Sequence, residues 1–220
     1  MPTVPRRAAP AIPAAKGAQA AKTAARARTL RAPQEVRIIG GLWKRTRLPV
    51  ADLPGLRPTP DRVRETLFNW LGQDLSGWQV VDAFAGTGAL GLEAASRGAA
   101  AVLLVEHDGD QADALRALAR KLQAQGVTVE RGNALTALAR LAPGSQDLIL
   151  LDPPFDAKLH QKALVAAVPA LRPDGLVYLE APEPWSDQAL APLGLRQRRF
   201  MRAGAVHAHL LERVGSLGAP

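Results

Sequence analysis

The chain has 220 residues, of which 47% are hydrophobic and 22% are charged, a balance typical of a soluble globular protein with one main domain. It contains no cysteine, which excludes disulfide bonds and thiolate metal sites and agrees with a cytoplasmic location. The longest uncharged stretches reach about half the length that a membrane-spanning helix needs, so we expect no membrane segment.

The formal net charge of +8 is concentrated near the N-terminus. Residues 1–34 contain seven basic residues, twelve alanines and five prolines but no acid, and they lack apolar periodicity, so we expect a disordered tail. Residues 37–64 form a second basic segment. Both segments suit a polyanionic partner, whose phosphates bind lysine and arginine. A solubilising tail and a solvated surface are the equal alternative.

Residues 35–57 are expected to form a β-hairpin extension that precedes the main domain. Apolar Val36 and Ile38 alternate with an arginine, as in a strand with one buried face. The following pair, Gly40 and Gly41, is expected to supply the positive φ angles of a turn.

A helix is predicted at the start of the main domain, residues 58–220. Thr59 is placed to cap this helix, and Pro60 suits its first position, where the missing N–H has no helical partner to lose. Four apolar side chains recur at helical spacing and define one buried face: Val63, Leu67, Trp70 and Leu71. Arg62 and Arg64 are predicted to lie off that face.

From Trp78 onward, short apolar runs alternate with helical patterns, which predicts right-handed βαβ units and a mostly parallel sheet with helices on both faces. The predicted strands are 79–83, 101–106, 127–131, 147–152, 175–180, 196–201 and 205–211. The predicted helices are 88–97, 109–125, 134–141 and 158–171. The last two strands meet near Gly204 without a clear helix between them, so we expect them to form an antiparallel hairpin at one edge.

A glycine loop follows the first strand of this sheet, with the sequence Gly86-Thr-Gly-Ala-Leu-Gly91. Glycines allow a tight turn and a close approach of ligand to backbone, and the next helix offers its N-terminal N–H groups. Glu106 ends the second strand, where an acid binds ribose hydroxyls. These features suit both a nicotinamide dinucleotide and S-adenosylmethionine. Asp82, just before the loop, favours S-adenosylmethionine because it resembles the first motif of Rossmann-like methyltransferases.

The fourth strand ends in the tetrapeptide Asp152-Pro153-Pro154-Phe155. An aromatic amine is a poor nucleophile because its lone pair is delocalised into the ring, so its methylation requires acceptors for both N–H groups. Asp152 offers one acceptor, and a stiff turn can aim the Pro153 carbonyl as the second. Phe155 can stack on an extruded base. A proline-stiffened turn without a function is the alternative. The carboxyl ends of adjacent strands line one crevice, however, so the position of this sequence relative to the glycine loop favours an active site.

Four segments together resemble the RsmD family of bacterial 16S ribosomal RNA (guanine-N2)-methyltransferases, in the order found in that family. The helix start is the most distinguishing part, because other methyltransferases share only the later two motifs. The basic tail and Pro60, where a second threonine is expected, depart from the family pattern. The segments are Val36-Arg-Ile-Ile-Gly-Gly-Leu-Trp-Lys-Arg, Leu56-Arg-Pro-Thr-Pro-Asp-Arg-Val-Arg-Glu-Thr-Leu-Phe-Asn-Trp-Leu, Asp82-Ala-Phe-Ala-Gly-Thr-Gly-Ala-Leu-Gly-Leu-Glu and Asp152-Pro-Pro-Phe.

This resemblance implies an α/β, Rossmann-like class I methyltransferase fold, with a seven-stranded, mostly parallel sheet whose last strand is antiparallel. It implies S-adenosylmethionine as methyl donor and a guanine of 16S ribosomal RNA, or of an assembling small subunit, as acceptor. It also implies the cofactor contacts Asp82, Ala83, Phe84, Gly86, Gly88, Glu106, His107, Asn133 and Ala134. From the sequence alone, Asn133 suits a helix cap equally well.

The basic residues before the glycine loop are the candidates for RNA contact: Arg37, Lys44, Arg45, Arg47, Arg62 and Arg64. No metal site is expected, since His207 and His209 have no apparent third ligand. We expect a monomer without a membrane partner. Two other functions stay open, amino-group methylation of DNA or protein glutamine and an NAD-dependent oxidoreductase. The oxidoreductase leaves the Asp-Pro-Pro-Phe sequence unexplained.

Overall fold

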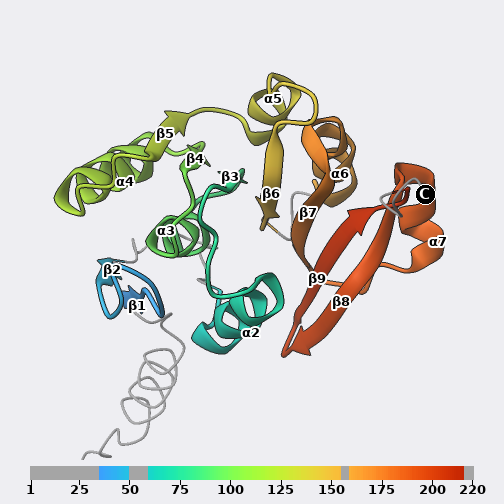
Figure 1. The fold of residues 1–220 in the computed structure, drawn as a ribbon, viewed down its shortest axis with the longest axis horizontal. Helices are drawn as coiled ribbons and strands as arrows, with labels where there is room; N and C mark the ends of the chain where they lie inside the picture. Colours follow the sequence, from blue (N-terminus) through green and yellow to red (C-terminus); the bar gives the residue numbers. More distant parts are fainter. Residues whose placement is uncertain (1–34, 50–58, 155–158, 216–220) are drawn as a thin grey trace, which may run out of the picture. The chain divides into compact units, whose positions relative to one another are not determined.

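The computed structural model describes residues 35–49, 59–154 and 159–215. All of them belong to one of the two units of the chain, residues 33–220, which includes the hairpin (Figure 1). The expectations for the tail at 1–34 and for Phe155 lie outside the described residues. No helix in the described ranges is long and apolar enough to cross a membrane.

A seven-stranded sheet forms the centre of this unit and confirms the predicted fold class (Figure 1). Its strands are β3 (Gln79–Asp82), β4 (Ala101–Glu106), β5 (Val127–Arg131), β6 (Gln146–Leu151), β7 (Leu171–Ala181), β8 (Leu195–Ala203) and β9 (Val206–Arg213). The spatial order is β5-β4-β3-β6-β7-β9-β8, in which β9 runs antiparallel to both of its neighbours. The turn between β8 and β9 contains Gly204 at φ +63°, where it was predicted.

Helices connect the strands, as the alternation of patterns predicts. They are α2 (Asp61–Leu71), α3 (Ala89–Ser96), α4 (Gly109–Lys121), α5 (Ala134–Ala139), α6 (His160–Ala167) and α7 (Asp187–Leu190), with 3-10 turns at Val168–Ala170 and Ala191–Leu193. The sequence pattern did not predict α7, because four residues are too few to establish a helical period. Its start is set by Ser186, whose hydroxyl accepts a hydrogen bond from the Ala189 N–H at 3.3 Å.

Hydrophobic side chains cover both faces of the sheet. Val80 and Leu150 belong to a core that includes side chains of α2, α3 and the hairpin, whereas Val81 and Ile149 belong to a second core with α5 and α6. Successive side chains of a strand point to opposite faces, so each central strand contributes to both cores. Burial on both faces explains why these strands appear in the sequence as continuous apolar runs.

The start of α2 differs from the prediction. Pro60 is the capping residue and makes no side-chain cap, whereas the Thr59 hydroxyl is directed to Asp152. Arg64 is fully buried, so its predicted position off the apolar face is wrong. Its guanidinium lies 2.7 Å from a carboxylate oxygen of Asp61 and 3.6 Å from one of Glu93. These two carboxylates compensate a positive charge that burial alone would make costly.

The N-terminal hairpin pairs β1 (Glu35–Arg37) with β2 (Arg47–Pro49). Its connection is longer than a turn centred on the two glycines, and only Gly41 of that pair has a positive φ, +72°. Gly41 also lies against the end of α3, where an added Cβ would be 1.8 Å from the Ser96 carbonyl oxygen. The Leu42 N–H donates to the same oxygen at 2.7 Å. The hairpin therefore uses an otherwise unpaired carbonyl of the helix end.

Glu93 fixes the hairpin to α3 from within the core. Its side chain is fully buried and accepts hydrogen bonds from the backbone N–H groups of Ile39 and Gly40, each at 2.7 Å. It also forms an ion pair with Arg97 at 2.8 Å, and the Arg97 guanidinium lies over the Phe68 ring. One carboxylate thus connects the hairpin, α2 and α3.

Gly41→Ala is expected to destabilise the protein much more than Gly194→Ala. Both glycines have positive φ, +72° and +69°, so each alanine carries a backbone strain of about 1–2 kcal/mol. An added Cβ at Gly194 meets nothing within 4 Å, whereas at Gly41 it meets backbone. Moving that backbone adds about 1–3 kcal/mol. Equal losses of unfolding free energy in urea titrations would contradict the close docking of the hairpin on α3.

Candidate active site

Four acidic side chains lie at the carboxyl ends of four adjacent strands. Asp82 ends β3, Glu106 ends β4, Asp152 follows β6 and Glu180 is the penultimate residue of β7. The strand pairings bring them to one edge of the sheet, since Asp82 is paired with Leu104 on one side and Leu150 on the other. Open α/β sheets bind their ligands at this edge. The glycine loop and the Asp-Pro-Pro sequence therefore meet, as predicted.

The glycine loop is held in place by its neighbours. Gly86 and Gly88 have φ angles of +50° and +76°, and Gly88 is the N-cap of α3. The Ala85 N–H donates to the carbonyl of Val105 on β4 at 2.9 Å, which fixes the loop to the adjacent strand. The loop is therefore held by backbone contacts with β4, and it leads directly into the N-terminus of α3.

The third glycine of the loop has a packing role. A Cβ on Gly91 would be 2.2 Å from a methyl group of Leu104 and 3.0 Å from the Cβ of Asp82. The Gly91 N–H donates to the Asp82 carboxylate at 2.9 Å. Asp82 is buried, and burial, together with smaller contributions from Glu106 and Glu180, raises the pKa of its carboxyl to about 7 against the lowering effect of the backbone hydrogen bonds.

Glu106 supports the loop with both carboxylate oxygens. One accepts from the Gly86 N–H and the other from the Asp108 N–H, each at 2.8 Å. Asp108 caps α4, and Gln111 of that helix donates to the Gly86 carbonyl at 2.8 Å. Each oxygen of Glu106 keeps a second lone pair, so the residue can still accept from ribose hydroxyls.

The other predicted cofactor residues follow the carboxyl ends of β3, β4 and β5. Ala83 and Ala134 are buried, Phe84 is partly buried, and His107 is exposed at the end of β4. Asn133 caps α5, with its side-chain oxygen accepting from the Thr136 N–H at 3.2 Å. The cap, which the sequence left open, is therefore present, and it leaves one lone pair of the Asn133 oxygen and the amide donor for a ligand.

Asp152 is partly buried and accepts a hydrogen bond from the Thr59 hydroxyl at 3.5 Å. Burial, the nearby Glu180 and Asp82 all raise the pKa of the Asp152 carboxyl well above its ordinary value. Pro153 is buried beside it and Pro154 is exposed. Asp152, the predicted hydrogen-bond acceptor, is thus a carboxyl group whose ionised form is destabilised by its surroundings.

Glu180 and Tyr178 were missed by the sequence analysis. Glu180 is only 2% exposed, accepts from the Tyr178 hydroxyl at 2.9 Å and also bonds to the Thr59 hydroxyl. Burial raises the pKa of its carboxyl, and burial followed by the neighbouring Glu180 raises the pKa of Tyr178. One feature of the sequence could have identified Glu180: it is a lone acid in the apolar run 175–181, which forms the strand next to β6.

The basic candidates divide into exposed and buried residues. Arg62 is exposed on α2, and the hairpin exposes four further basic side chains: Arg37, Lys44, Arg45 and Arg47. Arg47 is paired with Glu35 at 3.1 Å, a surface contact of little strength. Arg64 is buried against Glu93, so its proposed contact with RNA is corrected to a structural role.

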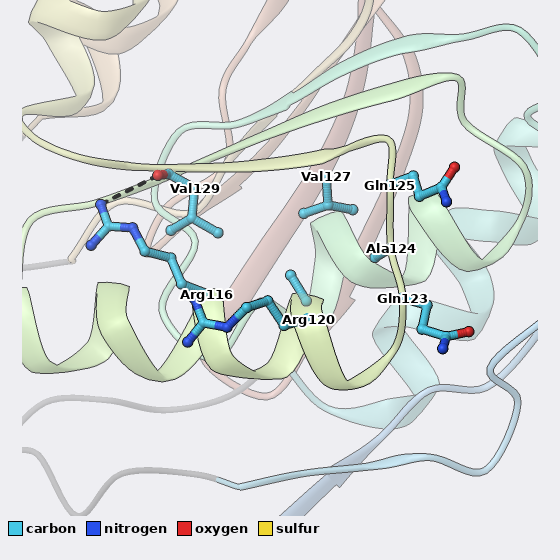
Figure 2. Close-up of a pocket in the computed structure, with 8 residues that line it drawn as sticks. Arg116, Arg120, Gln123, Ala124, Gln125, Val127 and Val129 are labelled. Atoms are coloured by element: carbon cyan, nitrogen blue, oxygen red, sulfur yellow. Dashed lines mark hydrogen bonds between the residues drawn. The ribbon is translucent and has the colours of Figure 1, made fainter.

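A shallow cavity of about 350 Å³ lies elsewhere, between the second half of α4 and the start of β5 (Figure 2). Arg116 points along it and donates to the Val129 carbonyl at 3.3 Å (Figure 2). Its lining of arginine, glutamine, alanine and valine includes no acid or nucleophile, so it offers no group for acid–base or nucleophilic catalysis. Within the described ranges, no three histidine or acidic side chains are grouped to hold a metal ion.

Known proteins share this sequence and this fold. The family described as conserved hypothetical protein 95 matches residues 36–212. Ribosomal RNA small subunit methyltransferase D of Escherichia coli K12 is 40% identical over 181 residues, which cover 81% of this chain and 90% of that protein. The protein of the same name from Haemophilus influenzae is 39% identical over 171 residues, 72% of this chain and 89% of that protein. The chain belongs to the ribosomal RNA small subunit methyltransferase D family.

Solved structures agree with this membership. A structure of a candidate methyltransferase from Escherichia coli matches with a TM-score of 0.71 and 35% identity, covering 81% of this chain and 98% of that one. TrmN from Thermus thermophilus matches with a TM-score of 0.56 and 25% identity over 69% of this chain and 48% of that one. The match to the RsmD family includes the hairpin and the whole sheet but not the tail at 1–34.

Asp82→Asn is expected to reduce the loss of stability as pH rises. The folded-state pKa of about 7 lies above the ordinary 3.8, so between these values the folded protein holds a proton that the unfolded chain releases. Stability therefore falls as pH rises through this window. Asparagine keeps an acceptor for the Gly91 N–H but does not ionise. Urea titrations at pH 5 and pH 8 measure the difference, with the exposed Asp174→Asn as control. An equal pH dependence in both variants would contradict this assignment.

Proposed function

We propose that this chain transfers a methyl group from S-adenosylmethionine to the exocyclic N2 amino group of a guanine in 16S ribosomal RNA. The observation that carries the proposal is the meeting of the glycine loop with Asp152 at adjacent strand ends. The membership in the RsmD family and the names of the relatives support ribosomal RNA as the substrate. The chemistry of the Asp-Pro-Pro sequence supports an aromatic amine as the acceptor.

The loop and its surroundings fit an adenosyl cofactor. Glu106 would hold the ribose hydroxyls, the amide donor of Asn133 would meet the adenine, and Asp82 would face the cationic methionine end. S-adenosylmethionine, when bound, supplies a methyl group on a positively charged sulfur. A cation beside Asp82 would offset the burial that raises the pKa of its carboxyl to about 7. The site therefore suits a positively charged ligand better than a pyrophosphate.

Asp152 and the Pro153 carbonyl would polarise the amino group. Each accepts one N–H, which favours a nitrogen with an available lone pair that points at the methyl donor. The main requirement of an in-line transfer is this positioning. The attacking nitrogen must also lose a proton, and a carboxylate with a raised pKa is a stronger base for it than an ordinary aspartate. Phe155 would stack on the extruded base.

RNA would reach the site over the basic surfaces. The exposed basic residues Arg37, Lys44, Arg45, Arg47 and Arg62 would bind phosphates, and the tail at 1–34 would add charge. The substrate would be 16S ribosomal RNA, alone or in an assembling small subunit, in the cytoplasm. We expect the protein to act as a monomer.

Asp152→Asn is expected to lower methyl transfer by about 10²–10⁴-fold, the contribution of a positioned acceptor and base. Affinity for S-adenosylhomocysteine should stay within a few-fold of wild type, since Asp152 faces the acceptor. The exposed Asp174→Asn on β7 serves as a charge-matched control. The assay is tritiated-methyl transfer onto ribosomal RNA from a strain that lacks the gene, with identification of the modified nucleoside. A turnover of Asp152→Asn equal to that of wild type would show that Asp152 has no catalytic role. Tritium in a nucleoside other than N2-methylguanosine would refute the proposed acceptor.

Glu180→Gln is expected to move the acid limb of the pH–rate profile to lower pH. Activity requires ionised Asp152, so it rises with pH through the raised pKa of that carboxyl. The negative charge of Glu180 contributes to this raised pKa, and glutamine removes the charge while it can still accept from Tyr178. Single-turnover rates across pH measure the shift. An unchanged limb, or one moved to higher pH, would contradict the coupling.

A further inference from the structure

Thr59 is a buried polar residue whose hydroxyl is directed away from the helix that it precedes. Its side chain lies two residues before α2 and is only 5% exposed. The N-cap of α2 is Pro60, which forms no side-chain cap. The Thr59 hydroxyl instead lies 3.5 Å from a carboxylate oxygen of Asp152, 93 residues later in the chain. A buried hydroxyl with such a distant partner has a role that local helix structure does not explain.

The strand register brings Asp152 and Glu180 to adjacent positions on the face of the sheet where Thr59 lies. Leu151 of β6 is paired with Leu179 of β7, and Asp152 and Glu180 are the next residues of the two chain segments. The side chains of Leu151 and Leu179 belong to the core with α5 and α6. Because successive side chains alternate, the two acids are directed to the other face, whose core includes side chains of α2. Thr59 therefore approaches Asp152 from the same face as Glu180.

The available hydrogen-bond donors divide between these two acids. A hydroxyl has one proton and donates to one carboxylate at a time. Glu180 has a donor of its own, because the Tyr178 hydroxyl donates to it at 2.9 Å. Among the described residues, the donor to the Asp152 side chain is the Thr59 hydroxyl. The proton of Thr59 is therefore needed at Asp152 more than at Glu180.

Donation from Thr59 gives Asp152 two properties that an acceptor for an amine requires. A bond to one carboxylate oxygen restricts the rotation of the group and leaves the second oxygen for an N–H of the substrate. It also stabilises the negative charge, which burial, Glu180 and Asp82 disfavour. The distance of 3.5 Å is long for such a bond, but hydrogen bonds of catalytic groups are often long without substrate and shorten in its complex.

We propose that Thr59 is a positioning residue for methyl transfer, whose hydroxyl orients the Asp152 carboxylate toward the acceptor amine and stabilises its ionised form. Thr59 does not contact the amine and acts through Asp152. The inference rests on the proposed function, since it assigns a role at the same acceptor site.

The ionisation of Asp152 depends on groups from three elements. Burial, Glu180 on β7 and Asp82 on β3 raise the pKa of its carboxyl, and the Thr59 hydroxyl before α2 lowers it. Tyr178, whose hydroxyl donates to Glu180, is a further ionisable group at this position. Loss of the Thr59 donor therefore raises the pKa of Asp152 still further, so that a higher pH is needed to ionise it. This direction is opposite to the one expected for Glu180→Gln.

Thr59→Val removes the hydroxyl and keeps the branched shape of the side chain. The acid limb of the single-turnover pH–rate profile should move to higher pH by about one unit, which lowers the rate at acidic pH about tenfold. Thr59→Ser keeps the donor and should restore the wild-type limb. The exposed Thr128→Val on β5 is the matched control. An unmoved limb in Thr59→Val, or a serine variant as impaired as the valine variant, would overturn the positioning role.

A double-mutant cycle with Asp152→Asn tests whether Thr59 acts through Asp152. In the Asp152→Asn background, Thr59→Val should change the rate by no more than about twofold, because the charge that the hydroxyl stabilises is already absent. A second loss as large as the one in the wild-type background would show that Thr59 acts independently of Asp152, and it would overturn the inference. Urea titrations of the single variants check that each remains folded under the assay conditions.

A carbon-13 NMR titration of the Asp152 carboxyl separates this inference from the proposed function, because it needs no RNA. The pKa of Asp152 should be higher in Thr59→Val than in wild-type protein and unchanged in Thr128→Val. A higher pKa in a protein that methylates no RNA would refute the proposed function and keep the contact between Thr59 and Asp152. An equal pKa in wild type and Thr59→Val, in a protein that methylates RNA, would keep the function and overturn the inference.

Discussion

The buried carboxylate of Glu93 is the contact that relates the two functional parts of this chain. The glycine loop leads into the first residue of α3, and Glu93 in the same helix holds the hairpin through two backbone N–H groups. A helix of eight residues is about 12 Å long, so the distance between loop and hairpin is set by regular backbone geometry. A protein that must present RNA to a bound cofactor benefits from such a rigid spacer.

Burial makes this contact specific as well as strong. Glu93, Arg97 and Arg64 all lie in a medium of low polarity, where an unpaired charge costs several kcal/mol. The charges of these three side chains compensate one another only when the hairpin, α2 and α3 are in their native positions. An apolar replacement of similar volume could be equally stable, but it would not fix the hairpin by hydrogen bonds. We therefore interpret these ion pairs as contacts that fix the position of the hairpin rather than as a source of net stability.

The regular part of the fold was predictable from the sequence, because burial on both faces of a parallel sheet leaves clear apolar runs. The bounds of β4 and β5 agree with the prediction, and the glycine loop and Asp152 lie where the strand order places them. β7 was predicted too short. It begins at Leu171, where one pair with Gln146 precedes a register shift, and the polar residues there gave no strand signal.

What the sequence did not reveal depends on partners distant in the chain. Arg64 is an arginine at a polar-looking helix position, and its buried charge is compensated by Glu93, 29 residues later, as well as by Asp61 in the same turn. Thr59 suits a cap by local rules, yet its hydroxyl is directed to Asp152, 93 residues away. Local propensity decides such positions only when no tertiary partner competes. Glu180 was missed for the same reason, since a strand pattern does not show which neighbours a lone acid has.

These two corrections explain the segment that most distinguishes the family from other methyltransferases. Thr59 donates to Asp152, the carboxylate proposed to accept from the amine, and five residues later Arg64 joins the Glu93 group that holds the hairpin. Residues 59–64 thus connect Asp152 to the N-terminal hairpin by way of Glu93, and Asp61 within this segment pairs with Arg64. The helix start by which the sequence resembles the RsmD family is therefore the segment that holds the hairpin and the strand-end carboxylate of Asp152 in a fixed relation.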